Sequence, residues 1–389
     1  MYRLHTPERP YTDPWLLPLA DRLRLLAGAH QRVAYYYEEP NNSTFRYRAW
    51  NMAQVLNDGP DPAVRASWFH RADLTALDTL GEHADRLVIC RSGYEHHVAG
   101  LIERFRTHGK PVFFDVDDFV FDTDYVHLIV DNLALDKNDP RVWDDWFGMI
   151  GRMGRTLRAC DAAVTTHAFL ATRIAAFTGR PVAVVPNFMN REQLAMSDAV
   201  WADKAASGFA RDGRLTLGYF SGSPSHRLDY AIVEPALEAL LDAHPQLDVL
   251  TVGYIEPGPA LQRFGGRVKR APFHDWVNLQ RLVGSVEVNL MPLQANLFTD
   301  CKSPLKYFEA AAVGTLSMAS PSANYAEAIR DGVTGALARA HEWQRRLDAW
   351  VRDFDRLAPA MREQGRQDAL ARFAWTGQRQ AIRRALQLG

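Results

Sequence analysis

Two lysines and a glutamate lie close together in the segment TDCKSPLKYFEAAAVGT, residues 299–315, and the lysines suit the binding of an anion. The segment predicts a helix, with Ser303 as its N-cap and Pro304 at the first helical position, where the missing N–H costs nothing. Lys306 and Glu309 are three residues apart and share a face of this helix, and Lys302 lies just before its first turn. A helix start that carries two lysines attracts phosphates and other anions. The alternative is a surface Lys–Glu pair on an ordinary amphipathic helix.

A turn rich in glycine and serine follows a predicted strand in the stretch LGYFSGSPSHRLD, residues 217–229. Gly222 and Ser223 lie where backbone N–H groups can approach an anion closely. The stretch is neither a GxGxxG fingerprint nor a Walker loop, and a Gly-Ser turn by itself is usually only a turn. Together with the two lysines, however, it predicts the second wall of one phosphate pocket. His226, Arg227 and Asp229 follow directly and are placed to touch a phosphate or an acceptor.

The run FFDVDDF, residues 113–119, places three carboxylates at the end of another predicted strand. Asp115, Asp117 and Asp118 are hard oxygen ligands at a close spacing, which suits a divalent cation. The alternatives are binding of a sugar or acceptor and solvated loop carboxylates, with Asp115 anchoring the strand end. The thirteen histidines form no ligand cluster of the zinc type in the sequence.

The composition indicates a globular protein with two domains, because 389 residues are too many for one ordinary core. Lys and Arg number 45 against 46 Asp and Glu, so the charge gives no reason to expect a nucleic-acid partner. The three cysteines, Cys90, Cys160 and Cys301, are scattered and odd in number, which indicates a reducing compartment. We therefore expect a cytoplasmic protein.

Neither a signal peptide nor a membrane span is predicted. The N-terminal stretch is polar and interrupted by prolines, and no uncharged stretch approaches the roughly 20 residues that a span needs. Residues 15–32 are amphipathic and carry arginines, so they can lie on a membrane surface or pack against their own domain.

Short β-rich runs alternate with helical patterns along the chain, which predicts parallel sheets with crossover helices. The first series of predicted strands comprises residues 33–39, 66–69, 86–92, 111–118, 162–167 and 181–187. A second series begins afresh and comprises residues 215–222, 247–253, 267–273, 286–293 and 315–320. Two doubly wound sheets in tandem leave a cleft that the carboxyl ends of their strands can line.

The predicted organisation follows from these two series. Residues 1–195 form an N-terminal Rossmann-like domain, and residues 196–214 form a polar, alanine-rich linker. Residues 215–365 form the C-terminal Rossmann-like domain. Residues 366–389 form a C-terminal helix that can pack back on the N-terminal domain.

The order of short motifs in the second half resembles a known family. The motifs are GYFSGS, TVG, PFHDW, NLMPL, KSPLKYFEAAAVG, a strand that ends in serine, and AIRDGVTG. In this order they are similar to those of group 1 glycosyltransferases of the GT-B fold, a family described as retaining and dependent on nucleotide sugars. In the first half, STFRYR, CRSGYEHH, GKPVFFDVDD and VVPN also occur in the family's usual order.

The resemblance assigns roles to the helix at residues 303–313. Glu309 matches the second glutamate of the family's E-x7-E motif and would accept hydrogen bonds from the ribose hydroxyls of the nucleotide. Lys302 and Lys306 would hold the two phosphates and neutralise the charge of the leaving diphosphate. Cys301 stands where the family has its first glutamate, and Asp300 is adjacent but out of register by one residue. The residues expected to bind the donor and its phosphates are Gly222, Ser223, His226, Asp300 and Ser303.

By the same resemblance, the turn at residues 270–279 lies along the nucleobase, with Pro272 and Phe273 against the base and Trp276 either beside them or in the core. The strand end at residues 113–119 would face the cleft from the N-terminal domain, away from the phosphates. The resemblance therefore implies no metal and no other cofactor. The residues expected on the acceptor or sugar side are Asp117, Asp118, Arg46 and His167, although Arg46 can equally belong to a helix-capping turn.

The resemblance implies a hexosyl- or deoxyhexosyltransferase that moves a sugar from a nucleoside diphosphate to an acceptor hydroxyl with retention of configuration. The acceptor class is a glycan, a lipid-linked glycan or a natural product, as in polysaccharide biosynthesis, and a place on the inner face of the membrane fits such a partner. Two alternatives stay open. One is an epimerase or hydrolase of nucleotide sugars on the same fold, and the other is a catalytically silent module that binds glycan or scaffolds an assembly.

Overall fold

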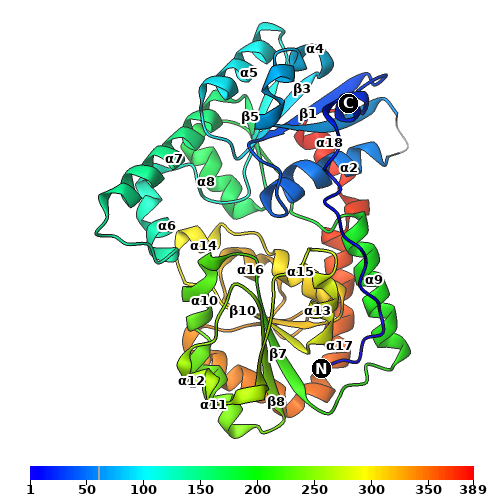
Figure 1. Cartoon of the computed structure of the whole chain (residues 1–389), viewed down its shortest axis with the longest axis vertical. Coiled ribbons are helices and arrows are strands. Elements are labelled where there is room, and N and C mark those ends of the chain that lie inside the picture. The colour runs from blue at the N-terminus through cyan, green and yellow to red at the C-terminus, as the bar shows by residue number, and fades with distance from the viewer. Residues whose placement is uncertain (60–61) are drawn as a thin grey trace.

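Two six-stranded parallel β-sheets form the centres of two domains, which lie one above the other in Figure 1. The computed structural model describes residues 1–59 and 62–389. The strands are short apolar runs, such as RLVIC in β3 (Arg86–Cys90) and VFFD in β4 (Val112–Asp115). Helices cover both faces of such sheets, so these runs are buried on both sides. The predicted architecture of two α/β domains is confirmed.

The N-terminal sheet has the strand order β2-β1-β3-β4-β5-β6. The chain moves outward from β1 to β2 and then returns to β3 on the other side of β1, so the direction of winding reverses between β1 and β3. In a doubly wound sheet, ligands bind where this reversal occurs, beyond the carboxyl ends of the strands. The remaining strands of this sheet are β1 (Gln31–Tyr37), β2 (Val64–His70), β5 (Ala162–Thr165) and β6 (Val182–Val184).

The C-terminal sheet has the strand order β12-β11-β10-β7-β8-β9, and its winding reverses between β7 and β10. The glycine- and serine-rich turn follows β7, so it lies at this reversal. The two-residue strand β12 was not predicted, because two residues carry no readable alternation. The strands are β7 (Leu215–Ser221), β8 (Leu247–Gly253), β9 (Val268–Ala271), β10 (Val288–Met291), β11 (Leu316–Ala319) and β12 (Ala336–Leu337).

Helices connect the strands and cover the sheets (Figure 1). Those of the N-terminal half are α1 (Leu19–Arg24), the π-helix η1 (Arg46–Trp50), α2 (Asn51–Asn57), η2 (Arg71–Asp73), α3 (Leu74–Leu77), α4 (Leu80–His83), α5 (His96–Thr107), η3 (Thr123–Tyr125), α6 (Val126–Asn132), α7 (Pro140–Ala159) and α8 (Ala168–Thr178). Those that follow are α9 (Arg191–Ala206), η4 (Pro224–His226), α10 (Arg227–Ala231), α11 (Glu234–Ala243), α12 (Pro259–Gln262), η5 (Gly265–Arg267), α13 (Leu279–Ser285), α14 (Leu297–Asp300), α15 (Leu305–Ala312), α16 (Ala323–Ala328), η6 (Ala340–Glu342), α17 (Trp343–Phe373), η7 (Trp375–Gly377) and α18 (Arg379–Ala385).

The chain crosses between the domains three times. Residues 1–14, the N-terminal segment, run along α9 onto the C-terminal domain (Figure 1). The backbone N–H of Tyr2 donates to the carbonyl of Ser285 at 2.8 Å, and that of Arg9 donates to Asn278 Oδ1 at 2.9 Å. The second crossing leads from β6 into α9, and the third leads from α17 into α18.

The segment predicted as a linker, residues 196–214, contains most of helix α9. Asn190 caps this helix, because its side chain accepts a hydrogen bond from the backbone N–H of Gln193. Helix α18 returns to the N-terminal domain, where it packs on α2 and β6. There the Arg86 guanidinium donates to the carbonyl of Leu386 at 2.8 Å.

The helix predicted to begin at Pro304 begins one residue later. Pro304 has φ −79° and ψ 32°, which is not helical, so Leu305 is the first helical residue of α15. No side-chain oxygen caps this helix, and Ser303 Oγ is buried without a hydrogen-bond partner in the described residues. The helix ends before Gly314, which has φ +67° and so adopts the left-handed conformation that terminates many helices.

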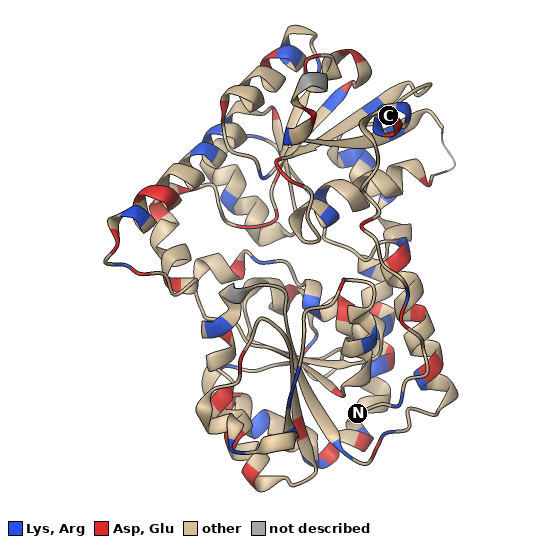
Figure 2. Cartoon of the chain, viewed as in Figure 1, with Lys and Arg blue, Asp and Glu red and all other residues tan. Residues whose placement is uncertain are grey.

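Basic and acidic residues are interspersed along the ribbon of both domains in Figure 2. None of the helices in residues 1–59 and 62–389 is long and apolar enough to cross a membrane. Within the amphipathic stretch at residues 15–32, Trp15 is buried and Arg22 forms a buried ion pair with Asp73 at 2.6 Å. Leu16 of the same stretch is exposed.

Candidate active site

Two adjoining pockets lie at the reversal points of the two sheets. Pocket A lies between Arg46 and Tyr47 of the N-terminal domain and Gly222, Phe273, Trp276 and Glu309 of the C-terminal domain. Pocket B is lined by Asp117, Asp118, His226, Lys302, Ser303 and Tyr325. Lys306 and Leu305 line both pockets, so the start of α15 lies between them.

Two lysines and two aspartates line pocket B. Lys302 Nζ lies 3.8 Å from Asp118 Oδ2 and 4.4 Å from the centre of the Phe298 ring. Lys306 Nζ lies 4.8 Å from the centre of the Tyr219 ring, and no carboxylate of the described residues forms an ion pair with it. Burial lowers the pKa of Lys306 to about 8, and the nearby charge of Lys302 contributes to this shift.

Ser303 lies between these lysines in sequence and adds a free hydroxyl. Its Oγ is buried and has no hydrogen-bond partner in the described part of the chain, although it lines pocket B. A buried hydroxyl without a partner carries a desolvation cost that a ligand would relieve. The ammonium groups and this hydroxyl together suit a ligand with several anionic oxygens.

His226 is neutral at pH 7 and lies opposite the lysines. Its Nδ1 is 3.0 Å from Asp229 Oδ2, and Asp229 also accepts the backbone N–H of Gln294 at 3.0 Å. Burial lowers the pKa of His226 to about 4, and Lys306 adds to the shift. Because the Asp229 carboxylate accepts from Nδ1, the neutral ring carries its proton there and Nε2 is an acceptor. His226 therefore suits a hydroxyl better than a phosphate.

The turn after β7 leaves open space beside pocket A. A Cβ atom on Gly222 would meet no heavy atom within 4 Å. Ser221 Oγ donates to the carbonyl of Ser223 at 2.7 Å, and the hydroxyls of Ser223 and Ser225 are 2.6 Å apart. These bonds fix the turn, and Ser221 and Gly222 both line pocket A.

Glu309 is buried and receives donors from outside its own domain. Its Oε1 accepts a hydrogen bond from Tyr47 Oη at 2.7 Å and one from Gln193 Nε2 at 2.8 Å. Arg46 Nη2 lies 3.8 Å from the same oxygen. Tyr47 and Gln193 were not identified from the sequence, because their partner is more than 100 residues away in the chain.

Aromatic side chains form the far wall of pocket A. Phe273 is 43% exposed and lines the pocket, whereas Pro272 does not line it and accepts a hydrogen bond from His274 at its carbonyl. Trp276 is buried, and its Nε1–H donates to Tyr11 Oη at 2.5 Å. The Arg46 guanidinium lies 4.9 Å from the Trp276 ring centre and 4.0 Å from that of Tyr47.

The carboxylates that follow β4 have separate partners. Asp115 forms a fully buried ion pair with Arg48 at 2.6 Å. Asp117 accepts from Thr44 Oγ1 at 3.1 Å and lies 3.4 Å from Arg91, while Asp118 lies between Arg91 and Lys302. In residues 1–59 and 62–389, no three His, Cys, Asp or Glu side chains are grouped so that they could hold a metal ion.

Four of the predicted site residues do not line pockets A and B: Ser223 and Pro272, whose contacts are given above, and His167 and Asp300. His167 is buried, and its Nε2 lies 3.1 Å from the carbonyl oxygen of Cys301. Asp300 Oδ1 accepts the backbone N–H of Ala323 at 2.8 Å, which caps the start of α16. Both therefore hold the loop that carries Lys302 in place.

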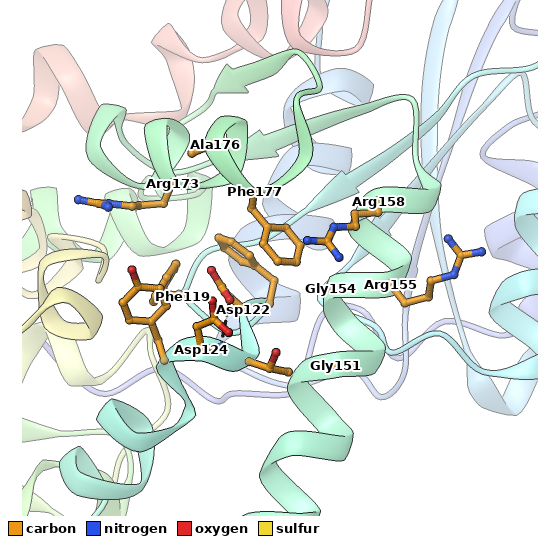
Figure 3. A pocket seen from close by; sticks show the side chains of 13 residues that line it. Phe119, Asp122, Asp124, Gly151, Gly154, Arg155, Arg158, Arg173, Ala176 and Phe177 are labelled. Atoms are coloured by element: carbon orange, nitrogen blue, oxygen red, sulfur yellow. Dashed lines mark hydrogen bonds between the residues drawn. The ribbon is translucent and has the colours of Figure 1, made fainter.

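A third pocket, pocket C, lies in the N-terminal domain between η3, α7 and α8 (Figure 3). Its volume is about 450 Å³. The guanidinium of Arg158 lies 3.9 Å from the centre of the Phe177 ring (Figure 3). Its lining begins at Phe119, one residue after Asp118 of pocket B, and also includes Asp122, Asp124 and Arg173.

Residues 216–358 match the family described as "Glycosyl transferases group 1". The match lies within the C-terminal domain, which is similar to this family. No curated protein matches the sequence. The matched residues 216–358 include Lys302, Ser303, Lys306 and Glu309. The family match therefore covers the residues on which the motif resemblance rests.

Solved structures resemble the chain over both domains. HepE of Anabaena, solved with UDP and glucose, is 14% identical, with a TM-score of 0.63 over 92% of this chain and 100% of HepE. WaaG, a glycosyltransferase involved in lipopolysaccharide biosynthesis, is 13% identical, with a TM-score of 0.59 over 91% and 99%. Sucrose-phosphate synthase of Thermosynechococcus elongatus is 15% identical, with a TM-score of 0.55 over 92% and 97%. The chain thus has the GT-B fold, and the C-terminal domain is one of its two halves.

Proposed function

We propose that the protein is a glycosyltransferase that moves a sugar from a nucleoside diphosphate to an acceptor hydroxyl. The observation that carries this proposal is the start of α15, where Lys302, Lys306 and the unpartnered hydroxyl of Ser303 face one pocket. The family match of residues 216–358 and the similarity to the structures of HepE with UDP-glucose and with UDP support a nucleotide-sugar donor.

In this proposal, the diphosphate lies in pocket B and the nucleoside lies in pocket A. Lys302 and Lys306 neutralise the negative charge that develops on the leaving diphosphate, which lowers the barrier for breaking the sugar–oxygen bond. The free oxygen of Glu309 accepts ribose hydroxyls, and Phe273 lies along the base. Retention and a hexosyl or deoxyhexosyl donor come from the family resemblance.

We further propose that the reaction proceeds without a metal ion, because the lysines can supply the charge that a metal would supply. Asp117 and Asp118 already pair with Arg91 and Lys302, so they suit hydroxyl groups of the donor sugar or the acceptor.

Pocket C is the proposed place for the part of the acceptor remote from the reacting hydroxyl. Its lining begins one residue after Asp118 of pocket B. A glycan, lipid-linked glycan or natural product is the proposed acceptor class. The predicted location is the cytoplasm, at the inner face of the membrane.

Calorimetric titration with UDP, GDP, dTDP, ADP and CDP, each with EDTA and with magnesium, tests the proposal. We expect one diphosphate to bind equally well in both conditions, and the double variant Lys302→Ala/Lys306→Ala to bind it at least tenfold more weakly, since each charge-assisted hydrogen bond contributes about 1.5–3 kcal/mol. The matched control is Lys137→Ala/Lys269→Ala, which removes two lysines that pair with Asp131 and Asp248 and line neither pocket A nor pocket B.

Three results would contradict parts of this proposal. Equal binding by parent and double variant would refute the phosphate role of the lysines. Turnover of a nucleotide sugar without acceptor would indicate a hydrolase or epimerase. No binding of any diphosphate would indicate a catalytically silent module.

A further inference from the structure

Hydrogen bonds to the Glu309 carboxylate connect the two domains. Glu309 belongs to α15 of the C-terminal domain, Tyr47 belongs to η1 of the N-terminal domain, and Gln193 belongs to α9 at the crossing between them. Tyr47, Gln193 and Glu309 are buried, with exposures of 2%, 0% and 7%. Buried hydrogen bonds of this kind hold their groups in one orientation.

The donors all reach one oxygen of the carboxylate. Oε1 accepts from Tyr47 Oη at 2.7 Å and from Gln193 Nε2 at 2.8 Å, and Arg46 Nη2 lies 3.8 Å away. Oε2 accepts no hydrogen bond from the described residues, and Glu309 lines pocket A. An ionised carboxylate has further acceptor sites on its second oxygen, so this side of Glu309 is free for a ligand.

The backbone around Tyr47 is specialised for this contact. Arg46–Trp50 is a π-helix, a rare form that is frequent at functional sites. Arg46 is held in turn, because its Nε donates to the carbonyl of Asn42 at 2.8 Å and its Nη1 donates to Gln193 Oε1 at 3.2 Å. Gln193 therefore accepts from Arg46 with one atom and donates to Glu309 with the other, which fixes the orientation of its amide.

We propose that Tyr47 and Gln193 are positioning residues that hold Glu309 so that Oε2 accepts the ribose hydroxyls of the nucleoside diphosphate. Through them, the N-terminal domain sets the preference of the C-terminal domain for ribose over deoxyribose. This inference rests on the proposed function, because it needs a nucleotide in pocket A.

The test compares Tyr47→Phe with the parent, using UDP, GDP, ADP and CDP, each beside its 2′-deoxy counterpart. Phenylalanine keeps the ring that stacks on Arg46 and removes only the hydroxyl. The loss of a direct hydrogen bond between a ligand and a charged group corresponds to about a tenfold change or more. Tyr47 acts on the ligand only through Glu309, so its effect should be smaller. We expect Tyr47→Phe to bind the preferred ribonucleotide about three- to tenfold more weakly. Its deoxy counterpart keeps only the 3′-hydroxyl and should lose less affinity, so that the ribose preference shrinks.

Tyr230→Phe is the matched control, because Tyr230 Oη is buried without a hydrogen-bond partner in the described residues. This variant should keep the full ribose preference. Gln193→Leu is the second variant, and it should shrink the preference in the same direction if Tyr47→Phe fails to fold. Melting temperatures of all variants without ligand identify any general loss of structure.

A purely structural role predicts equal losses for both nucleotides of a pair, and that result would overturn the inference while leaving the proposed function intact. An unchanged preference in Tyr47→Phe, or a parent that binds deoxyribonucleotides as tightly as ribonucleotides, would also overturn it. If the parent bound no nucleotide, the proposed function would fail and the inference with it.

Discussion

Raising the pH from 7 to 9 should weaken nucleoside diphosphate binding through Lys306. Its pKa of about 8 lies below the usual value for lysine because the ammonium is desolvated between pockets A and B. The charged form is the one that binds phosphate, so affinity is greatest well below pH 8 and falls as the pH rises through 8. The protonated fraction falls from about nine-tenths at pH 7 to about one-tenth at pH 9.

This change corresponds to about a ninefold rise in Kd, or about 1.3 kcal/mol. A bound diphosphate favours the charged form, so the pKa in the complex is higher and the free protein determines the dependence. His226, whose pKa is about 4, stays neutral over this range and contributes nothing to the slope. The measurement is calorimetric titration of the preferred diphosphate at half-unit steps of pH.

Lys306→Arg provides the control, because a guanidinium stays protonated up to pH 9. Titration of the ligand itself affects parent and variant equally, so the difference between their slopes isolates Lys306. A Kd that does not change between pH 7 and 9 in the parent, or that changes equally in Lys306→Arg, would refute the reasoning.

Two stability predictions follow from the packing. Replacing Arg48 by Met should lower the free energy of unfolding by about 3–5 kcal/mol in urea denaturation, because it leaves the Asp115 carboxylate buried without its cation; an effect below about 1 kcal/mol would contradict this. Gly284→Ala should lower the free energy of unfolding by about 1–3 kcal/mol, because the new Cβ would lie 2.3 Å from Val200 Cγ1. Adding Val200→Ala should recover part of this loss of stability. Gly81→Ala, whose Cβ would meet no heavy atom within 4 Å, is the control and should not destabilise the protein.

The sequence was sufficient for the strands and the two-sheet architecture, because each strand is a short apolar run between turn residues. It was insufficient for β12, whose two residues carry no pattern, and for the start of α15. Ser303 and Pro304 have the residue types of an N-cap and first helical position. The structure instead gives Pro304 a non-helical ψ of 32° and leaves the Ser303 hydroxyl unpartnered at pocket B.

The site could be predicted only where its residues are close in sequence. Lys302, Lys306 and Glu309 share one segment, so spacing brings them together. Tyr47 and Gln193 contact Glu309 across 262 and 116 residues, and no local pattern reveals such contacts. Asp300 and His167 have suitable residue types, but their partners are Ala323 and Cys301, which only tertiary structure reveals.

The three crossings between the domains make the two halves of the molecule hard to separate. A protease that cuts only the loop after α9, between Ser207 and Arg214, would leave the N-terminal segment bound to Ser285 and Asn278 and α18 bound to α2 and β6. The two fragments would then stay bound to each other and elute together in size-exclusion chromatography under native conditions. The same interlocking restrains any sliding of one domain past the other, so opening of the cleft would have to be a hinge rotation about the crossings.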